Sequence, residues 1–482
     1  MSIAYPTETA ESPAVDHAPG LDRAFSCVPE ERSVELTKIE GKIPTFLRGT
    51  YYLNGPARFF RGEVRYRHWL DGDGMVCALR LGDGRAHLTA RFVRCTKWVE
   101  EEAAGHALYR AFGTSFPGDR LVRGIALESP LNVSLYPFAG TLLAFGEQGL
   151  PWELDPETLE TRGPYNFGGA LNPLSPFAAH PKIDPETGDL FNFGISFSAT
   201  QPSLNVYRFK ADGGLVYRKR VALDQPCSLH DFLFTGRHVA FYLAPYRLDM
   251  ESLTQGGTLL DSLRWEPEKG SRLLVVDRES GEPVATVPVG NRYVLHGINA
   301  FEDGDHLVVD VLELDRPVYD QYNLADLFAS VVPGRPVRLV VDLATGTLLD
   351  RIEIAYDKAP DFPAIDPALA GHPYEDFWML GISKTGQPGR KTFDQVVHAN
   401  WSHPDRVDVW TAPPGQYLGG EPAFAPNPEG GGGVICQSFD AETGESAFLI
   451  FDAFDVEAGP VAMVRVEGFV HLGFHAMFEP VG

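Results

Sequence analysis

The chain has 482 residues, 44% of them hydrophobic, and its 41 basic and 65 acidic residues give a net charge of −24. This length exceeds the roughly 250–300 residues at which a single core stops growing, so we expect several domains or one large repeat architecture. The acidic balance argues against nucleic acid as a partner. The 49 Gly and 38 Pro residues favour many short strands joined by tight turns over helical bundles.

The start of the chain, residues 1–34, contains neither a basic leader nor an apolar run, and we expect a poorly ordered tail there. No run of 18 apolar residues occurs, so we expect no membrane span, although peripheral contact with a membrane stays open. The five cysteines are odd in number and lack C-x-x-C spacing, which argues against a disulfide framework and a zinc site. Free thiols in a reducing compartment fit a cytoplasmic location.

From about residue 35 onward, apolar runs of four to eight residues alternate with turn residues, which is typical of antiparallel strands. Helical periodicity is confined to the stretches 31–38, 105–112 and 324–332. An Asp-initiated turn, most often D-x-x-[ST]-G, follows an apolar strand at five places. Aspartate opens such a turn through its side chain and glycine supplies the positive φ that closes it. These turns begin at Asp155, Asp184, Asp277, Asp342 and Asp440.

One small antiparallel unit reused over some 440 residues predicts an all-β fold, a β-propeller of about four to eight blades in one domain over residues 35–482, and this length could supply seven blades. Two β-sandwich domains are the alternative. The segments 245–270, 314–336 and 357–395 are longer than hairpins require. We expect these long loops, with a few short helices, to cap one face of the propeller, where binding sites usually lie.

Four of the 14 histidines, His180, His230, His296 and His475, lie at the ends or edges of strand-like runs. Their spacing of 50, 66 and 179 residues excludes a zinc finger or an H-E-x-x-H helix, whose ligands lie a few residues apart. A propeller could instead supply one ligand from each of several blades. Imidazole suits Fe, Cu, Zn or Ni, and carboxylates are expected behind the rings to accept their outer N–H groups. His68, His398 and His471 are the rival histidines.

The surroundings of these histidines resemble the carotenoid cleavage oxygenase family, from about residue 35 to residue 478 and in the family's order. The matching motifs are GTYYLNGPARFF, HWLDGDGMV, LLAFGEQGLPWELDPETLET, AHPKIDPETGDLFNFG, SLHDF, LHGINAF, GEPAFAP and GFHAMF. The resemblance implies a seven-bladed propeller that binds Fe(2+) through four histidines and splits carbon–carbon double bonds with O₂. It makes His180, His230, His296 and His475 the iron ligands. HWLDGDGM itself is expected to be structural.

The same resemblance assigns Glu147 in FGEQG and Glu421 in GGEPAF to the carboxylates behind the ligands. The family's third carboxylate is a Glu before Phe-Pro, whereas DFPAID here places Asp361 at that position. Because Asp is one methylene shorter, we expect its hydrogen bond to the histidine to be longer, bridged by water or absent. Glu375 is the alternative residue for this role.

The implied function is that of a non-haem Fe(II) dioxygenase that cleaves a conjugated double bond of a carotenoid or apocarotenoid with O₂, giving two carbonyl products. No catalytic side chain is implied beyond the iron site. One alternative is cleavage of stilbenes or phenylpropenes; such relatives engage a phenol with a Lys and a Tyr, and no Lys occurs between Lys97 and Lys182. The other alternative is a non-catalytic binding propeller. An apolar membrane-facing patch, or else buried packing, is expected at 111–116 and 327–333.

Overall fold

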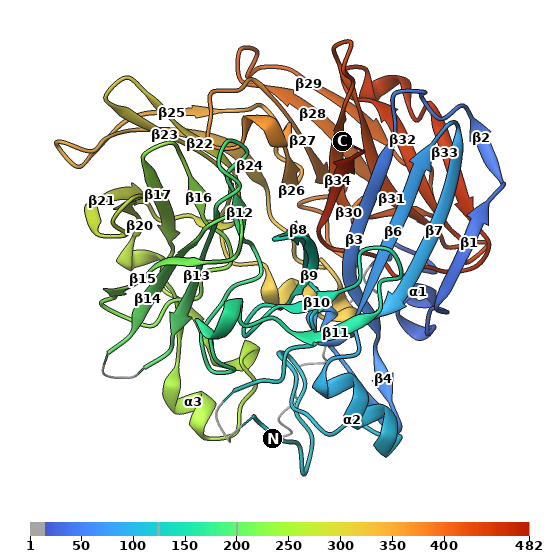
Figure 1. Cartoon of the computed structure of the whole chain (residues 1–482), viewed down its shortest axis with the longest axis horizontal. Helices are drawn as coiled ribbons and strands as arrows, with labels where there is room; N and C mark the ends of the chain where they lie inside the picture. The colour runs from blue at the N-terminus through green and yellow to red at the C-terminus, as the bar shows by residue number, and fades with distance from the viewer. Residues whose placement is uncertain (1–14, 123–125, 199–200, 482) are drawn as a thin grey trace, which may run out of the picture.

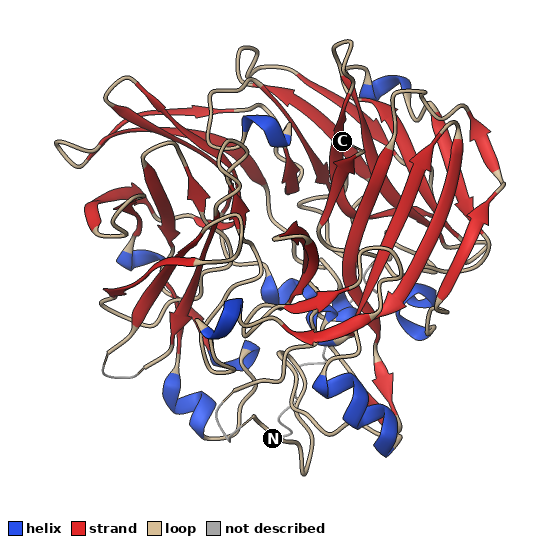
Figure 2. Ribbon diagram, viewed as in Figure 1, coloured by secondary structure: helices blue, strands red, loops and turns tan. Residues whose placement is uncertain are grey.

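The computed structural model describes residues 15–122, 126–198 and 201–481, and these residues form seven sheets of four or five strands arranged around a common centre (Figures 1 and 2). All pairings within the seven sheets are antiparallel. The innermost strands of most neighbouring sheets contact one another around the centre. The predicted seven-bladed propeller is confirmed.

Two blades are built from both ends of the chain. Blade 1 contains, from its outer to its inner edge, β1 (Arg32–Leu36), β7 (Arg85–Phe92), β6 (Asp73–Gly82), β3 (Gly49–Arg58) and β34 (Ala476–Pro480). Blade 7 contains, in the same order, β2 (Ile39–Gly41), β33 (Ala462–Val466), β32 (Ser446–Asp452), β31 (Gly432–Asp440) and β30 (Gln416–Pro426). The C-terminal strand therefore completes the first blade and an N-terminal strand completes the last, which closes the ring with backbone hydrogen bonds.

The other five blades are each continuous in sequence, and their strands are given from the innermost outward. Blade 2 contains β8 (Ser134–Phe138), β9 (Thr141–Phe145), β10 (Trp152–Leu154) and β11 (Thr161–Pro164); blade 3 contains β12 (Lys182–Ile183), β13 (Leu190–Ser196), β14 (Ser203–Phe209) and β15 (Leu215–Ala222). Blade 4 contains β16 (Leu233–Phe234), β17 (His238–Leu243), β20 (Ser271–Asp277) and β21 (Pro283–Gly290). Blade 5 contains β22 (Tyr293–Asp303), β23 (His306–Leu314), β24 (Gly334–Asp342) and β25 (Thr347–Glu353); blade 6 contains β26 (Asp361–Ala364), β27 (Asp376–Gly381), β28 (Gln395–Asn400) and β29 (Val407–Thr411).

The remaining elements are short and lie outside the blade strands, in the segments that connect them. Two small hairpins pair β4 (Phe60–Arg61) with β5 (Val64–Arg65) and β18 (Tyr246–Leu248) with β19 (Leu263–Trp265). The α-helices are α1 (Asp22–Ser26), α2 (Thr96–Ala104) and α3 (Met250–Thr254). The 3-10 turns are η1 (Trp69–Asp71), η2 (Phe167–Gly169), η3 (Leu260–Ser262), η4 (Pro267–Lys269), η5 (Tyr319–Tyr322), η6 (Leu324–Asp326), η7 (Pro367–Leu369) and η8 (Val456–Ala458). Within the described residues, no helix has both the length and the apolar character needed to cross a bilayer.

The Asp-initiated turns form hairpin connections as predicted. In each, the Asp carboxylate accepts a hydrogen bond from a backbone N–H two or three residues further on. Gly188, Gly281, Gly346 and Gly444 close four of them with φ between 66° and 75°. These local contacts explain why the turn could be recognised from four or five residues alone.

The three predicted helices are wrong. Residues 32–36 of the first form strand β1, because β7 offers a free edge that satisfies their backbone groups. The second, 105–112, is irregular, and the helix α2 ends immediately before it. The third, 324–332, keeps only the 3-10 turn η6. Short helices have little stability of their own, so hydrogen bonds to distant parts of the chain determine the secondary structure of such segments.

The start of the described chain packs on the propeller, unlike the tail expected for 1–34. Ala18 and Leu21 are fully buried, and Arg390 forms ion pairs with Asp16 and Asp22. Residues 1–14 lie outside the described residues. Of the segments expected as long loops, 357–395 instead contains the inner strands β26 and β27 of blade 6.

Candidate metal centre

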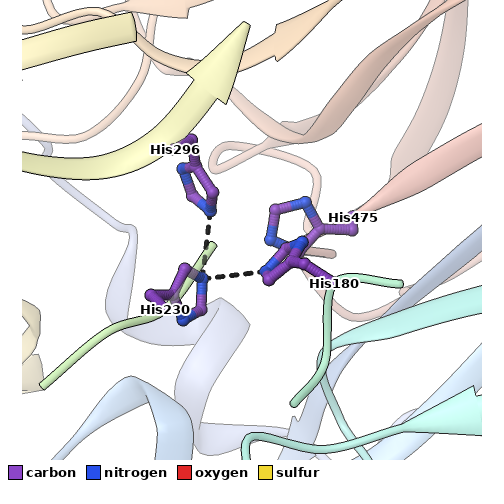
Figure 3. A group of neighbouring side chains, drawn as sticks. All are labelled: His180, His230, His296 and His475. Atoms are coloured by element: carbon purple, nitrogen blue, oxygen red, sulfur yellow. Dashed lines mark hydrogen bonds between the residues drawn. The ribbon is translucent and has the colours of Figure 1, made fainter. Parts of the chain in front are cut away.

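The structure brings the four predicted histidines together at the centre of the ring (Figure 3). Each lies on or shortly before the innermost strand of a different blade: His180 precedes β12, His230 precedes β16, His296 lies on β22 and His475 directly precedes β34. All four side chains are buried. The Nε2 atoms of His180 and His230 lie 2.9 Å apart and those of His230 and His296 lie 3.1 Å apart. One ring nitrogen from each of the four lies within 4.8 Å of the others.

The three remaining blades each contribute a carboxylate behind the histidines. Glu147 follows β9 of blade 2, and its two oxygens lie 2.8 and 3.0 Å from His230 Nδ1. Asp361 begins β26 of blade 6, and Glu421 lies on β30 of blade 7. Glu421 Oε2 lies 3.3 Å from the Nδ1 atom of His475. Every blade therefore contributes one residue to the site.

Asp361 differs from the sequence expectation. Its Oδ1 atom lies 2.5 Å from His296 Nδ1, so the hydrogen bond is direct and short. The backbone accounts for this reach: Phe362 has a φ of 53°, and the β26–β27 pairing shifts register between Asp361 and Ala364. Such a local irregularity re-aims a side chain. Asp361 thus reaches His296 directly in spite of its shorter side chain.

Glu375, the alternative to Asp361, points elsewhere. Its side chain is exposed and accepts a hydrogen bond from Ser402 Oγ. The structure therefore brings Asp361 to the histidine cluster and leaves Glu375 outside it.

The donor set fits a metal ion. Because three of the Nδ1 atoms face carboxylates, those nitrogens carry the hydrogen and the Nε2 lone pairs converge on one point. Two nitrogens about 2.1 Å from one ion and at right angles lie about 3.0 Å apart, whereas a tetrahedral site separates them by about 3.4 Å. The observed separations of 2.9 and 3.1 Å match the right-angle arrangement. These two separations favour right-angle over tetrahedral placement of the nitrogens, and His180, His230, His296 and His475 would hold the metal.

Electrostatics favour the neutral, ligating form of at least two rings. Burial, followed by the neighbouring imidazoles, lowers the pKa of His180 well below its usual range. Burial also lowers the pKa of His475. At His296, burial lowers the pKa but the Asp361 carboxylate outweighs it, so the pKa is raised. That carboxylate makes His296 the most basic donor among these three rings.

The rival histidines lie outside the cluster. His68 Nδ1 accepts a hydrogen bond from Leu70 N, and its Nε2 lies 2.7 Å from the carbonyl oxygen of Tyr319. His398 pairs with Asp376 at 2.8 Å. His471 is buried, and neither of its ring nitrogens has a hydrogen-bond partner among the described residues.

Two carboxylates of the HWLDGDGM motif have structural partners. Asp71 accepts hydrogen bonds from Gly113 N and Thr114 Oγ1. Asp73 forms buried ion pairs with Arg61 and Lys97, at 2.7 and 2.6 Å. Both carboxylates anchor neighbouring segments.

A largely apolar cavity of about 1030 Å³, part of it open to solvent, lies on one side of the site. It borders Glu147 and Tyr319, and its walls include Phe112, Phe177, Phe197 and Leu259. Two of the segments expected to cap the propeller, 245–270 and 314–336, contribute to these walls. The cavity also borders Lys97, but the Lys97 ammonium already pairs with Asp73 and with Glu101.

A second cavity, about 1530 Å³ and also part solvent, borders His180, His296 and His475 together with Glu421. The histidine cluster therefore lies between two cavities. The two segments considered for a membrane-facing patch, 111–116 and 327–333, take the buried alternative: Ala111, Leu327 and Phe328 are buried.

A seven-bladed propeller with four axial histidines and three supporting carboxylates defines a class of metal-binding propellers. Residues 24–480 match the family model described as RPE65, retinal pigment epithelial membrane protein, so the chain belongs to this family, the RPE65/carotenoid cleavage oxygenase family, and is an enzyme of it. The chain is 28% identical over 475 residues to apocarotenoid-15,15'-oxygenase of Synechocystis, covering 94% of each protein.

Further relatives have other names. The chain is 27% identical over 458 residues to isoeugenol monooxygenase of Pseudomonas nitroreducens, covering 92% of this chain and 94% of the relative. It is 30% identical over 507 residues to probable carotenoid cleavage dioxygenase 4, chloroplastic, of Arabidopsis thaliana, covering 97% and 81%. The crystal structure of cobalt-substituted Synechocystis ACO superimposes with a TM-score of 0.87 at 27% identity, covering 96% of this chain and 98% of that one.

Proposed function

We propose that this protein is a non-haem Fe(II) dioxygenase that cleaves a conjugated carbon–carbon double bond of an apocarotenoid or carotenoid with O₂, giving two carbonyl products. The observation that carries the proposal is the four-imidazole cluster, three histidines of which border a largely apolar cavity, while a second largely apolar cavity borders Glu147 behind His230. His180, His230, His296 and His475 would hold the iron. Bound Fe(II) would supply the activation of O₂, which an alkene does not react with unaided.

The chain's own residues would orient the centre and the substrate. Glu147, Asp361 and Glu421 accept the Nδ1 hydrogens of three rings, which fixes their tautomers and their orientation. The aromatic cavity walls would bind a polyene by apolar contact and exclude water from the reacting bond. One oxygen atom of O₂ would end on each carbon of the cleaved bond, so no side chain has to donate or remove a proton.

Cleavage of a stilbene or phenylpropene is the second candidate, supported by the isoeugenol, lignostilbene and resveratrol oxygenases among the relatives. Such a substrate carries a phenol that needs a polar partner. Lys97 borders the cavity, but its ammonium is 1% exposed and paired with two carboxylates. Because Lys97 is already paired and cannot bind a phenol, a polyene substrate is favoured over a stilbene or phenylpropene.

The experiment is anaerobic loading of the protein with Fe(II), followed by a panel of carotenoids, apocarotenals, hydroxystilbenes and isoeugenol, with carbonyl products identified by mass. Two carbonyl products from an apocarotenal or carotenoid, absent with His296→Ala and present with His398→Ala, would support the proposal. Products only from the phenolic substrates would favour the second candidate. Protein that retains no iron would indicate a non-catalytic binding propeller.

We further infer a cytoplasmic location, supported by the odd number of cysteines without C-x-x-C spacing. Fractionation of cells that express the chain would test it, and recovery from an exported fraction would contradict it.

A further inference from the structure

The three carboxylates behind the histidines are not held in the same way. Asp361 Oδ1 accepts hydrogen bonds from His296 Nδ1 and from its neighbour Phe362 N, the latter at 2.9 Å. Its second oxygen, Oδ2, accepts a hydrogen bond of 3.1 Å from the hydroxyl of Tyr322. Asp361 thus has a side-chain donor from outside the histidine cluster, and both of its oxygens are engaged.

Tyr322 comes from a part of the chain distant from Asp361 in sequence. It ends the 3-10 turn η5, in the segment between β23 and β24 of blade 5, whereas Asp361 belongs to blade 6. The Tyr322 ring is buried and packs edge-on against Trp69 and Phe328, with centroids 6.0 and 5.1 Å away. This packing fixes the direction of the hydroxyl.

The turn that carries Tyr322 is itself anchored. His68 Nε2 lies 2.7 Å from the carbonyl oxygen of Tyr319, the first residue of η5, and donates its hydrogen because its Nδ1 accepts from Leu70 N. Tyr319 borders the largely apolar cavity next to Glu147. One short turn therefore contacts both the cavity and the carboxylate behind His296.

A carboxylate that binds an imidazole through one oxygen can still rotate about its Cβ–Cγ bond. A Glu side chain can adjust three torsions to keep this hydrogen bond. The shorter Asp side chain has fewer torsions, so the orientation of its carboxylate depends on what holds the other oxygen. We propose that Tyr322 is a positioning residue of the metal centre: its hydroxyl holds the Asp361 carboxylate in the plane that receives His296 Nδ1, and so orients His296 toward the metal. This proposal rests on the proposed function only in taking His296 as a metal ligand.

The test is metal affinity, measured by chelator competition with Co(II) and with Fe(II) under anaerobic conditions, with no substrate present. Tyr322→Phe removes one oxygen and keeps the ring packing. We expect it to weaken metal binding by about tenfold, the lower end of the range for residues that orient a ligand, and to change the visible absorption of the Co(II) protein. Urea unfolding of the same samples verifies that the variant is folded.

Tyr242→Phe is the matched control. Tyr242 is also buried and also donates to a carboxylate, Glu313, at 3.0 Å, but it lies away from the histidine cluster. We expect it to lose comparable stability while metal affinity and the Co(II) spectrum stay those of the wild type.

A double-mutant comparison shows whether Tyr322 acts through Asp361. In an Asp361→Ala background, Tyr322→Phe should have no further effect on metal affinity, because the acceptor is gone. Wild-type affinity in Tyr322→Phe, or an equal loss in both backgrounds, would overturn this proposal alone. Wild-type protein that binds neither metal would instead overturn the proposed function and this proposal with it.

Discussion

Lys182 Nζ lies 2.8 Å from Asp231 Oδ1, and the other oxygen of that carboxylate accepts a hydrogen bond from the backbone N–H of Gly297. These three residues closely follow His180, His230 and His296 in the chain. One carboxylate therefore links the three consecutive blades that present those histidines, through the Lys182 side chain and the Gly297 backbone.

Lys182→Met should lower the free energy of unfolding by about 1–3 kcal/mol, because a buried carboxylate loses its counter-charge but keeps its backbone donors. Urea unfolding measures the change. Lys219→Met, which breaks the exposed pair with Glu282, should stay within about 0.5 kcal/mol of the wild type. Equal effects of the two substitutions would show that the Lys182 pair contributes no more than a surface ion pair.

Replacing any one of His180, His230, His296 and His475 by Ala should remove most of the bound metal, because three imidazoles leave the ion with another open position. Metal content per chain, measured after gel filtration, is the readout. His398→Ala is the control, since its partner Asp376 lies outside the cluster. Full metal content in two or more of the four variants would rule out the assignment.

Asp361→Ala should weaken metal binding by about 10–100-fold, the usual cost of removing a hydrogen bond to a ligand histidine. Glu375→Ala should bind metal as the wild type does, because Glu375 contacts Ser402 and not the cluster. Asp361→Glu should not improve binding, since the hydrogen bond is already 2.5 Å long and an added methylene has to be accommodated by strain. Chelator competition distinguishes these three results.

Burial lowers the pKa of His471 to about 3, so the folded protein keeps this ring neutral at pH values where the unfolded chain protonates it. The stability that depends on neutral His471 is therefore present above about pH 6.5 and is lost as the pH falls toward 3. As the pH falls from 6 to 4, the free energy of unfolding of the wild type should decrease by up to about 1.4 kcal/mol per pH unit more than that of His471→Gln. Urea unfolding across this range tests it, with the exposed His403→Gln as control. The same pH dependence of the free energy of unfolding in the wild type and in His471→Gln would contradict the prediction.

The sequence by itself determined the features that depend on a few neighbouring residues. The Asp-initiated hairpins could be predicted because the aspartate contacts backbone two or three residues away and the glycine supplies its own φ. Alternating apolar runs likewise indicated strands and the propeller. The candidate ligands His180, His230, His296 and His475 were recognisable because each lies inside a motif of its own.

Only the tertiary structure decided the features that depend on partners distant in the chain. Residues 32–36 became a strand because β7 lies beside them. Asp361, and not Glu375, reaches His296 because the backbone turns at Phe362. The positive φ of Phe362 could not be predicted from its residue type. Tyr322 had no sequence signal, since 39 residues separate it from Asp361 and only the packing of η5 over blade 6 brings the hydroxyl to the carboxylate. Short-range backbone chemistry is encoded locally, whereas the alignment of a side chain with a distant acceptor is set by how the blades pack.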